Sequence, residues 1–191
     1  DGPMHVEVFR SPHPGNRALL TACAAHGVPV VHDINLADGA AVGIAQTNQL
    51  RGLRQDSATA YLRPARARRN LELRARAQVE RVHFEGRAAR GVVCVRGGER
   101  TLVRARREVV LCAGAFASPQ LLMLSGIGPA GRLRELGVDV LHDAPRVGED
   151  LQEHPELYLE YAYRGPTYST AMRWPSLVRA GIEFAFARRG R

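Results

Sequence analysis

Hydrophobic and polar residues alternate most clearly in the middle of the chain, between residues 71 and 106. Apolar residues at every second position share one face of an expected strand: Leu71, Leu73, Ala75, Ala77 and Val79. Val82 and Phe84 continue the run after a shift of one position, which predicts a bulge near Glu80-Arg81. Two-residue turn signals and further strands follow in order: Glu85-Gly86, residues 90–95, Gly97-Gly98 and residues 101–106. The pattern predicts an antiparallel meander of three strands.

A continuous apolar run over residues 109–113 has no polar alternation, as in strands of a parallel sheet that are covered on both faces. We therefore expect a buried strand here, followed by a tight Gly114-Ala115 turn. Ser118 is a suitable N-cap and Pro119 a suitable first residue for a helix that ends at Leu124, before two glycines.

The Gly114-Ala115 turn admits two interpretations. Ligands of open α/β sheets bind beyond the carboxyl ends of the strands, and small residues let the backbone approach them. A plain connection between strand and helix explains the same residues equally well.

Weaker patterns predict the remaining elements. They are a short strand with Val6 and Val8 on one face, a helix from Asn16 to His26 that Gly27 stops, short helices over 57–62 and 131–136, strands over 138–141 and 156–165, and a helix over 176–187.

Composition narrows the class of protein. The chain has 191 residues with 45% hydrophobic content, and no stretch approaches the roughly 18 apolar residues of a membrane span. It begins with Asp1, and we expect it to be an internal piece of a longer polypeptide. The three cysteines, Cys23, Cys94 and Cys112, lie in apolar surroundings and are expected to be buried, reduced thiols of a cytoplasmic protein.

The net charge of +8 raises the possibility of a nucleic-acid partner. However, all 27 basic residues are arginine, which indicates a compositional bias, and many of them alternate with apolar residues as on the outer face of a strand. Aromatic residues for base stacking are few, at 6%. Nucleic-acid binding is therefore disfavoured.

One block of sequence carries more information than its hydrophobic pattern alone. Gly114-Ala115, Ser118-Pro119, Leu121-Leu122 and Ser125-Gly126-Ile127-Gly128 resemble, position by position, a signature of the glucose-methanol-choline (GMC) oxidoreductase family. Supporting blocks flank it in family order: "GPMHV", "SATAYLRPARARRNLEL", "EVVLCAGAFASPQLL" and "RVGEDLQEHPELYLEY". The resemblance covers essentially the whole chain and is strongest to choline-dehydrogenase-like and alcohol-dehydrogenase-like members.

This resemblance implies an FAD enzyme that oxidises a small alcohol, choline-like or another primary alcohol, to the carbonyl. It implies an α/β, Rossmann-like FAD-binding portion over residues 71–150. Residues 1–70 and 151–191 would belong to an α+β substrate domain built on an antiparallel sheet. The electron acceptor stays open, and so does association with the membrane periphery, since no integral membrane segment is expected.

Few of the family's site residues carry over to this chain. Val79 corresponds to a strand residue whose backbone holds the FAD adenine, although a core valine is the plainer interpretation. Ala113 and Gly114 correspond to chain near the FAD crevice. Asp150 and Glu153 replace the family's usual Asn and Asp.

No catalytic residue and no metal site are expected within the chain. The family's catalytic histidine comes from the far C-terminus, so His154 is interpreted as structural. The family's Gly-rich dinucleotide loop is also missing, and the chain alone should therefore neither hold FAD tightly nor oxidise alcohols. Two alternatives remain: a non-catalytic interaction module of the same fold, and a basic nucleic-acid-binding domain.

Overall fold

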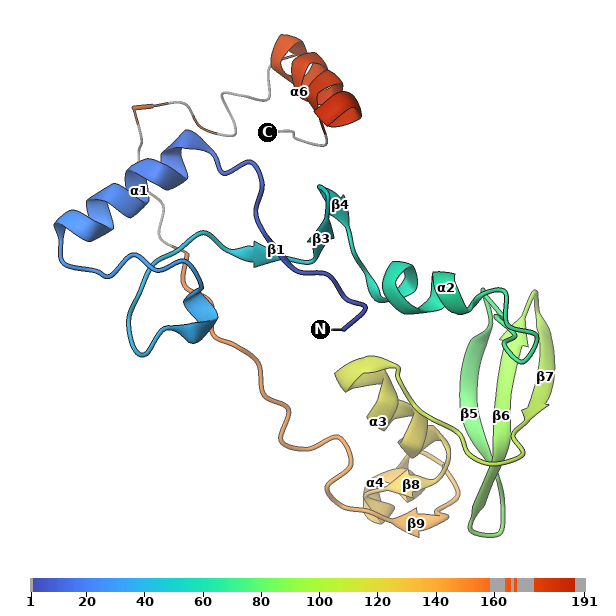
Figure 1. Cartoon of the computed structure of the whole chain (residues 1–191). Helices are drawn as coiled ribbons and strands as arrows, with labels where there is room; N and C mark the ends of the chain where they lie inside the picture. The colour runs from blue at the N-terminus through green and yellow to red at the C-terminus, as the bar shows by residue number, and fades with distance from the viewer. Residues whose placement is uncertain (1, 159–163, 166, 168–173, 188–191) are drawn as a thin grey trace. The chain divides into compact units, whose positions relative to one another are not determined.

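The computed structural model describes residues 2–158, 164–165, 167 and 174–187 (Figure 1). It divides into two compact units: Asp1–Leu71 with Tyr158–Arg191, and Glu72–Leu157. Both units contain helices, and their sheets are mainly antiparallel. The middle of the strand expected over 156–165, residues 159–163, lies outside the described residues.

Short elements joined by loops make up the first unit. Strand β1 (Glu7–Val8) pairs antiparallel with β2 (Gln46–Thr47), and β3 (Gln49–Leu50) pairs antiparallel with β4 (Leu53–Arg54). The helices are α1 (Pro14–Ala25), η1 (Ile34–Leu36), η2 (Ala58–Leu62), α2 (Arg63–Ala65) and α6 (Trp174–Ala187). The Gly52 N–H donates to the Glu7 carboxylate at 3.1 Å, which ties the β3–β4 turn to β1.

Helix α1 begins earlier than its sequence pattern predicted. Asn16 is not the N-cap, because Nδ1 of His13 accepts the N–H of Gly15 at 3.1 Å and Pro14 occupies the first helical position. Proline fits that position because its missing N–H would have no helical partner there. The predicted stop is confirmed, since Gly27 has a left-handed φ of 78° just after the helix.

Three antiparallel strands form the sheet of the second unit, in the order β5 (Gln78–Glu85), β6 (Ala88–Arg96) and β7 (Glu99–Arg104). A register shift between Val79 and Arg81 confirms the predicted bulge. The predicted turns are confirmed as well, with positive φ at Gly86, Gly97 and Gly98.

The first strand of the meander is shorter than its alternation predicted. Residues 71–77 are not a strand, and β5 begins only at Gln78. Arg76 adopts a left-handed φ of 57°, which breaks an extended backbone. The alternation of Leu71 and Leu73 therefore does not reflect a strand.

The buried strand expected over residues 109–113 is also not formed. This segment pairs with no strand among the described residues, and the Val110 side chain is 71% exposed. A strand of a parallel sheet needs a paired neighbour and cover on both faces, and the described residues supply no paired strand here.

Helix α3 (Gly114–Leu124) starts at Gly114 rather than at Pro119. Ser118 is thus no N-cap: it lies inside the helix and its hydroxyl accepts the Ala113 N–H at 3.1 Å. Gly114 has a φ of 86°, which lets the chain turn into the helix immediately after Ala113. The expected helix end is confirmed, with Gly126 at a φ of 85°.

Beyond α3, a small parallel pair joins β8 (Ile127–Gly128) to β9 (His142–Asp143), with α4 (Ala130–Glu135) between them. The strand expected over 138–141 is displaced toward the C-terminus, because the N–H groups of Leu141 and His142 both donate to the Gly126 carbonyl. A side chain at Gly126 would come within 2.4 Å of the Asp139 carbonyl oxygen. Only glycine therefore fits this crossing.

Helix α3 packs against β5, and Ser125 joins them. Its hydroxyl donates to the Leu121 carbonyl and accepts the N–H of Val82 at 2.8 Å. Val82 is 4% exposed, so this N–H has little access to water. The buried apolar residues of the second unit are Val82, Val93, Cys94, Ala130 and Leu133.

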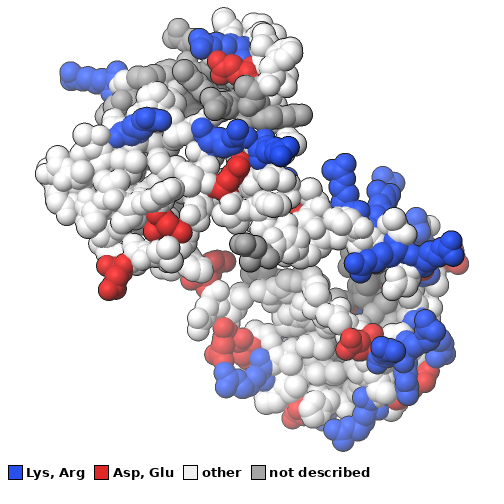
Figure 2. All heavy atoms as spheres, in the orientation of Figure 1, with Lys and Arg blue, Asp and Glu red and all other residues white. Residues whose placement is uncertain are grey.

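Ion pairs connect the strands of the meander. Arg100 on β7 contacts Glu80 on β5 at 2.7 Å, and Arg104 contacts Glu85 at 2.8 Å. The hydrogen bonds from these arginines hold the pKa of both glutamates below its ordinary value of 4.5. Figure 2 shows red side chains beside blue ones, and other blue side chains that project without a red neighbour.

Replacement of Ser125 by alanine should destabilise the fold. The buried N–H of Val82 would lose its acceptor, which costs about 1–3 kcal/mol of unfolding free energy, measured by urea denaturation. Ser118→Ala is the matched control, because it exposes the Ala113 N–H to water and should cost less than about 1 kcal/mol. Equal losses in the two variants would contradict this role of Ser125.

Acid should weaken the meander in a way that depends on Glu80 and Glu85. Their folded pKa values are lowered, so their stabilising effect is present above the ordinary value of 4.5 and is lost as pH falls through the folded values. We expect the urea midpoint to fall more between about pH 7 and pH 3 in the wild type than in Glu80→Gln/Glu85→Gln. The control Glu99→Gln/Glu149→Gln should behave as wild type, and an identical pH response in all three proteins would contradict the expectation.

Candidate functional site

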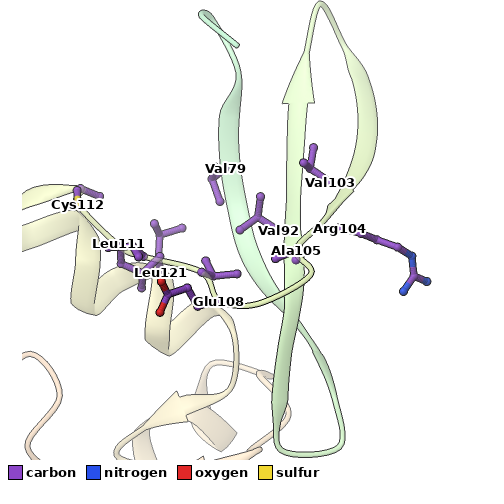
Figure 3. Close-up of a pocket in the computed structure, with 13 residues that line it drawn as sticks. Val79, Val92, Val103, Arg104, Ala105, Glu108, Leu111, Cys112 and Leu121 are labelled. Carbon is purple, nitrogen blue, oxygen red and sulfur yellow. The ribbon is translucent and has the colours of Figure 1, made fainter. Parts of the chain in front are cut away.

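A cavity of about 430 Å³ lies within the second unit, between the meander, helix α3 and the segment that connects them (Figure 3). Its lining consists of Val79, Gly91, Val92, Val103, Arg104, Ala105, residues 108–113 and Leu121. Most of these residues are apolar. The volume falls in the range of small-molecule sites, about 300–1,000 Å³.

The sheet supplies one wall through valines on its three strands. Val79 on β5, Val92 on β6 and Val103 on β7 all line the cavity. Strands β6 and β7 approach each other so closely at Gly91 that a Cβ there would lie 2.3 Å from the Val103 carbonyl oxygen. Glycine at this position therefore fixes the shape of the wall.

The connecting segment supplies the opposite wall, and the charged lining residues are Arg104 at the end of β7 and Glu108 on this segment. The Arg104 side chain points away from the cavity in Figure 3 and is held by Glu85 at 2.8 Å. Glu108 is exposed and contributes a carboxylate to the lining. The cavity is thus an apolar cleft that suits a flat, largely uncharged ring better than an anion.

Two of the three predicted site residues line this one cavity. Val79 and Ala113 both do so, although they are far apart in sequence. Gly114 is not among the lining residues, but it follows directly as the first residue of α3. Apart from its chain neighbours and the backbone of its own helix, no atom lies within 4 Å of the position of a Cβ at Gly114, so there is open space on this side of its backbone.

Sequence reasoning missed other lining residues, among them Gly91, Glu108 and Leu121. Leu121 belongs to the quoted signature block and could have been noticed there. Glu108 gave no signal, because a single glutamate before an apolar run is common at strand starts.

The cysteines differ in exposure. Cys94 lies in β6 and is buried, as predicted, whereas Cys23 is partly exposed. Cys112 is exposed on the connecting segment and lines the cavity, so the expectation of a buried thiol is wrong there. Cys112 is exposed because its segment, residues 109–113, pairs with no described strand.

The C-terminal part of the second unit carries the other candidate side chains. His154 is fully exposed, with Nδ1 3.8 Å from the carboxylate of Glu153. Asp150 is paired with Arg146 and has a left-handed φ of 55°, a conformation that Asn and Asp tolerate better than most residues. Asp150 therefore suits this backbone conformation.

The described residues contain no group of three or more His, Cys, Asp or Glu side chains placed to hold a metal ion. Among their helices, none has both the length and the apolar character needed to cross a bilayer.

A sequence model described as GMC oxidoreductase matches residues 1–156. Oxygen-dependent choline dehydrogenases from Serratia proteamaculans and Sinorhizobium medicae are 40% and 41% identical to the chain over 97% and 100% of its length. The chain spans about a third of the length of these curated relatives (34% and 35%).

A solved structure resembles the whole chain. It is an FAD-dependent oxidoreductase from Chaetomium thermophilum, which superposes with a TM-score of 0.89 at 26% identity. The match covers 100% of this chain and 34% of that protein.

Thiol labelling should distinguish the cavity cysteine from the core cysteine. A disulfide reagent such as Ellman's should modify Cys112 rapidly in the native protein, because its thiol is exposed. Cys94 should react only after denaturation, and peptide mass spectrometry assigns the labelled residue. Equally fast labelling of both would show that the sheet does not bury Cys94.

Proposed function

Because the chain belongs to the GMC oxidoreductase family, we propose that it forms part of an FAD-dependent enzyme that oxidises an alcohol to a carbonyl. The observation that carries the proposal is the cavity that brings Val79 and Ala113 together beside the start of α3. The family resemblance points to both residues without reference to the fold, and their shared cavity is an independent geometric observation.

The residues present fit one end of FAD. The valine wall formed by Val79, Val92 and Val103 offers an apolar face for the flat adenine ring. The open space at Gly114 leaves its backbone accessible to a bound group. Val79, Ala113 and Gly114 would hold the adenine end, and the flavin end would supply the electron-accepting chemistry of alcohol oxidation.

This chain's own residues would bind and orient rather than react. The cavity contains Glu108 as an ionisable carboxylate but no histidine, and His154 is fully exposed. Proton abstraction from an alcohol is most often performed by histidine. Because the chain spans about a third of its relatives' length, we infer that the catalytic base comes from the remaining polypeptide.

The substrate class follows from the named relatives. Both are choline dehydrogenases at about 40% identity, which favours choline or a similar small primary alcohol. Because both relatives are named oxygen-dependent, we propose oxygen as the electron acceptor.

Each unit receives a proposed role. The second unit, Glu72–Leu157, would be a portion of the FAD-binding domain, because it contains the cavity. The first unit would belong to an α+β substrate domain with an antiparallel sheet, which its paired short strands support. The cytoplasm is the proposed location, a choice supported by the free thiols of Cys23, Cys94 and Cys112.

The proposal is tested by flavin binding and reduction. A polypeptide of the relatives' length that contains this chain should retain stoichiometric FAD through gel filtration, and choline should bleach the flavin absorbance. The 191-residue chain alone should retain little FAD and oxidise no alcohol, because the residues that hold the pyrophosphate would be absent. A stoichiometrically yellow, active 191-residue chain would contradict this division of roles.

A variant pair tests the adenine site itself. Val79→Arg places a bulky charge in the apolar cleft, and we expect FAD affinity in the longer polypeptide to fall at least about tenfold, or about 1.4 kcal/mol. The neighbouring Gln78→Arg is the matched control, because Gln78 is exposed and does not line the cavity. Equal FAD affinity of the two variants would contradict the site.

A further inference from the structure

Another cavity, of about 560 Å³, lies within the first unit beside strands β2, β3 and β4. Residues 47–49 and 54–57 form most of its wall, because the pairing of β3 with β4 brings these two segments together. The Gln55 N–H holds them there by donating to the Asn48 carbonyl at 2.9 Å. The volume lies in the range of small-molecule sites, about 300–1,000 Å³. Seven of the eight lining residues carry polar side chains, in contrast to the apolar cleft of the second unit.

Five neutral side chains of this wall are available to a ligand. Two are hydroxyls and three are amides: Thr47, Ser57, Asn48, Gln49 and Gln55. None of the five forms a side-chain hydrogen bond with another described residue. Because hydroxyl and amide groups both donate and accept, the wall offers hydrogen bonds of both kinds.

The hydroxyl of Thr47 is buried and has no hydrogen-bond partner among the described residues. Most buried polar groups in proteins are hydrogen-bonded, because an unpaired group loses its bonds to water without compensation. Thr47 lies in the wall of the cavity, so a hydrogen-bonding molecule there would supply the partner. This orphaned hydroxyl therefore favours a polar ligand over an apolar one.

The two charged residues of the wall offset each other. Arg54 and Asp56 both line the cavity. The Thr59 N–H donates to the Asp56 carboxylate at 2.7 Å and, with a smaller contribution from Arg54, holds the pKa of Asp56 below its ordinary value of 3.8. Asp56 is therefore ionised at neutral pH and balances the positive charge of Arg54. A wall with no net charge favours a neutral ligand over an anion or a cation.

The lining of this cavity includes no aromatic side chain. A flat ring stacks best on an aromatic face, and a quaternary ammonium group is attracted to one. The cavity therefore suits neither an adenine or flavin ring nor a choline-like head group. An open-chain molecule that binds through hydrogen bonds alone fits the lining better.

We propose that this cavity binds a small open-chain polyol, a neutral molecule with a hydroxyl on most of its carbon atoms. Each hydroxyl donates one hydrogen bond and accepts up to two, so successive hydroxyls match the amides and hydroxyls along the wall. One of them serves the buried hydroxyl of Thr47. The proposal concerns the first unit alone and does not rest on the proposed oxidation of an alcohol.

Saturation-transfer NMR with sorbitol as the probe tests the proposal on the polypeptide of the relatives' length. We expect a saturable signal with a dissociation constant on the order of 1 mM. The comparison ligand 1,6-hexanediol has the same carbon chain but only the two end hydroxyls, and it should bind at least about tenfold more weakly. Thermal stabilisation alone is not diagnostic, because excluded polyols stabilise most proteins.

A variant pair tests the amides of the wall. Gln49→Leu/Gln55→Leu removes two amides at nearly constant side-chain size and should weaken sorbitol binding at least about tenfold. The matched control Gln78→Leu/Gln152→Leu changes two exposed glutamines of the second unit, and it should leave sorbitol binding within about twofold of wild type. Far-ultraviolet circular dichroism checks that each variant keeps its secondary structure.

Thr47→Val separates binding from folding. Valine has nearly the same shape as threonine and lacks the unpaired hydroxyl, so the thermal unfolding midpoint should stay constant or rise. Sorbitol binding should nevertheless weaken about fivefold. A residue with a merely structural role would not lose affinity while keeping stability.

Four results would overturn the proposal. They are absence of a saturable sorbitol signal, equal affinity for sorbitol and 1,6-hexanediol, an equal loss in the wall and control variants, and unchanged sorbitol binding by Thr47→Val. None of these readouts uses flavin absorbance or alcohol oxidation, so failure here is distinguishable from failure of the proposed enzyme function.

Discussion

The Ser125 hydroxyl joins helix α3 to the edge strand of the meander, and the geometry of the second unit depends on that junction. It accepts the N–H of buried Val82 and donates to the Leu121 carbonyl. An edge strand presents unpaired backbone groups, and here one of them is satisfied by a helix end. Because α3 is held in this way, Leu121 lies opposite Val79 and Val92 across the cavity. A single hydroxyl therefore couples the family's signature block to the candidate cofactor site.

Local backbone conformations could be predicted from the sequence, whereas contacts between residues that are far apart in sequence could not. The glycine turns and the bulge near Val79 follow from residues within a few positions. The apolar pattern of residues 109–113 predicts a strand that is covered on both faces. The described residues do not provide this cover. Likewise, Ser118 has the chemistry of an N-cap, but Gly114 can adopt a left-handed φ and so starts the helix earlier.

The candidate site shows the same division. Val79 and Ala113 were found through a resemblance, and nothing in their local sequence says that they share a cavity. Glu108 and Gly91 became visible only in three dimensions, Gly91 because a side chain there would collide with Val103. The site therefore combines one recognisable motif with a sheet whose register brings distant positions together.

Strand β7 forms the other edge of the meander, and its outer edge pairs with no described strand. An open edge is a template on which another chain could add a strand and begin aggregation. Arg100 and Arg104 lie along this strand, and their long charged side chains discourage that addition, as charged residues do on the edges of natural sheets. Their contacts with Glu80 and Glu85 draw the two guanidinium groups across the sheet. The same arginines that link the two outer strands of the sheet thus also help to keep separate molecules apart.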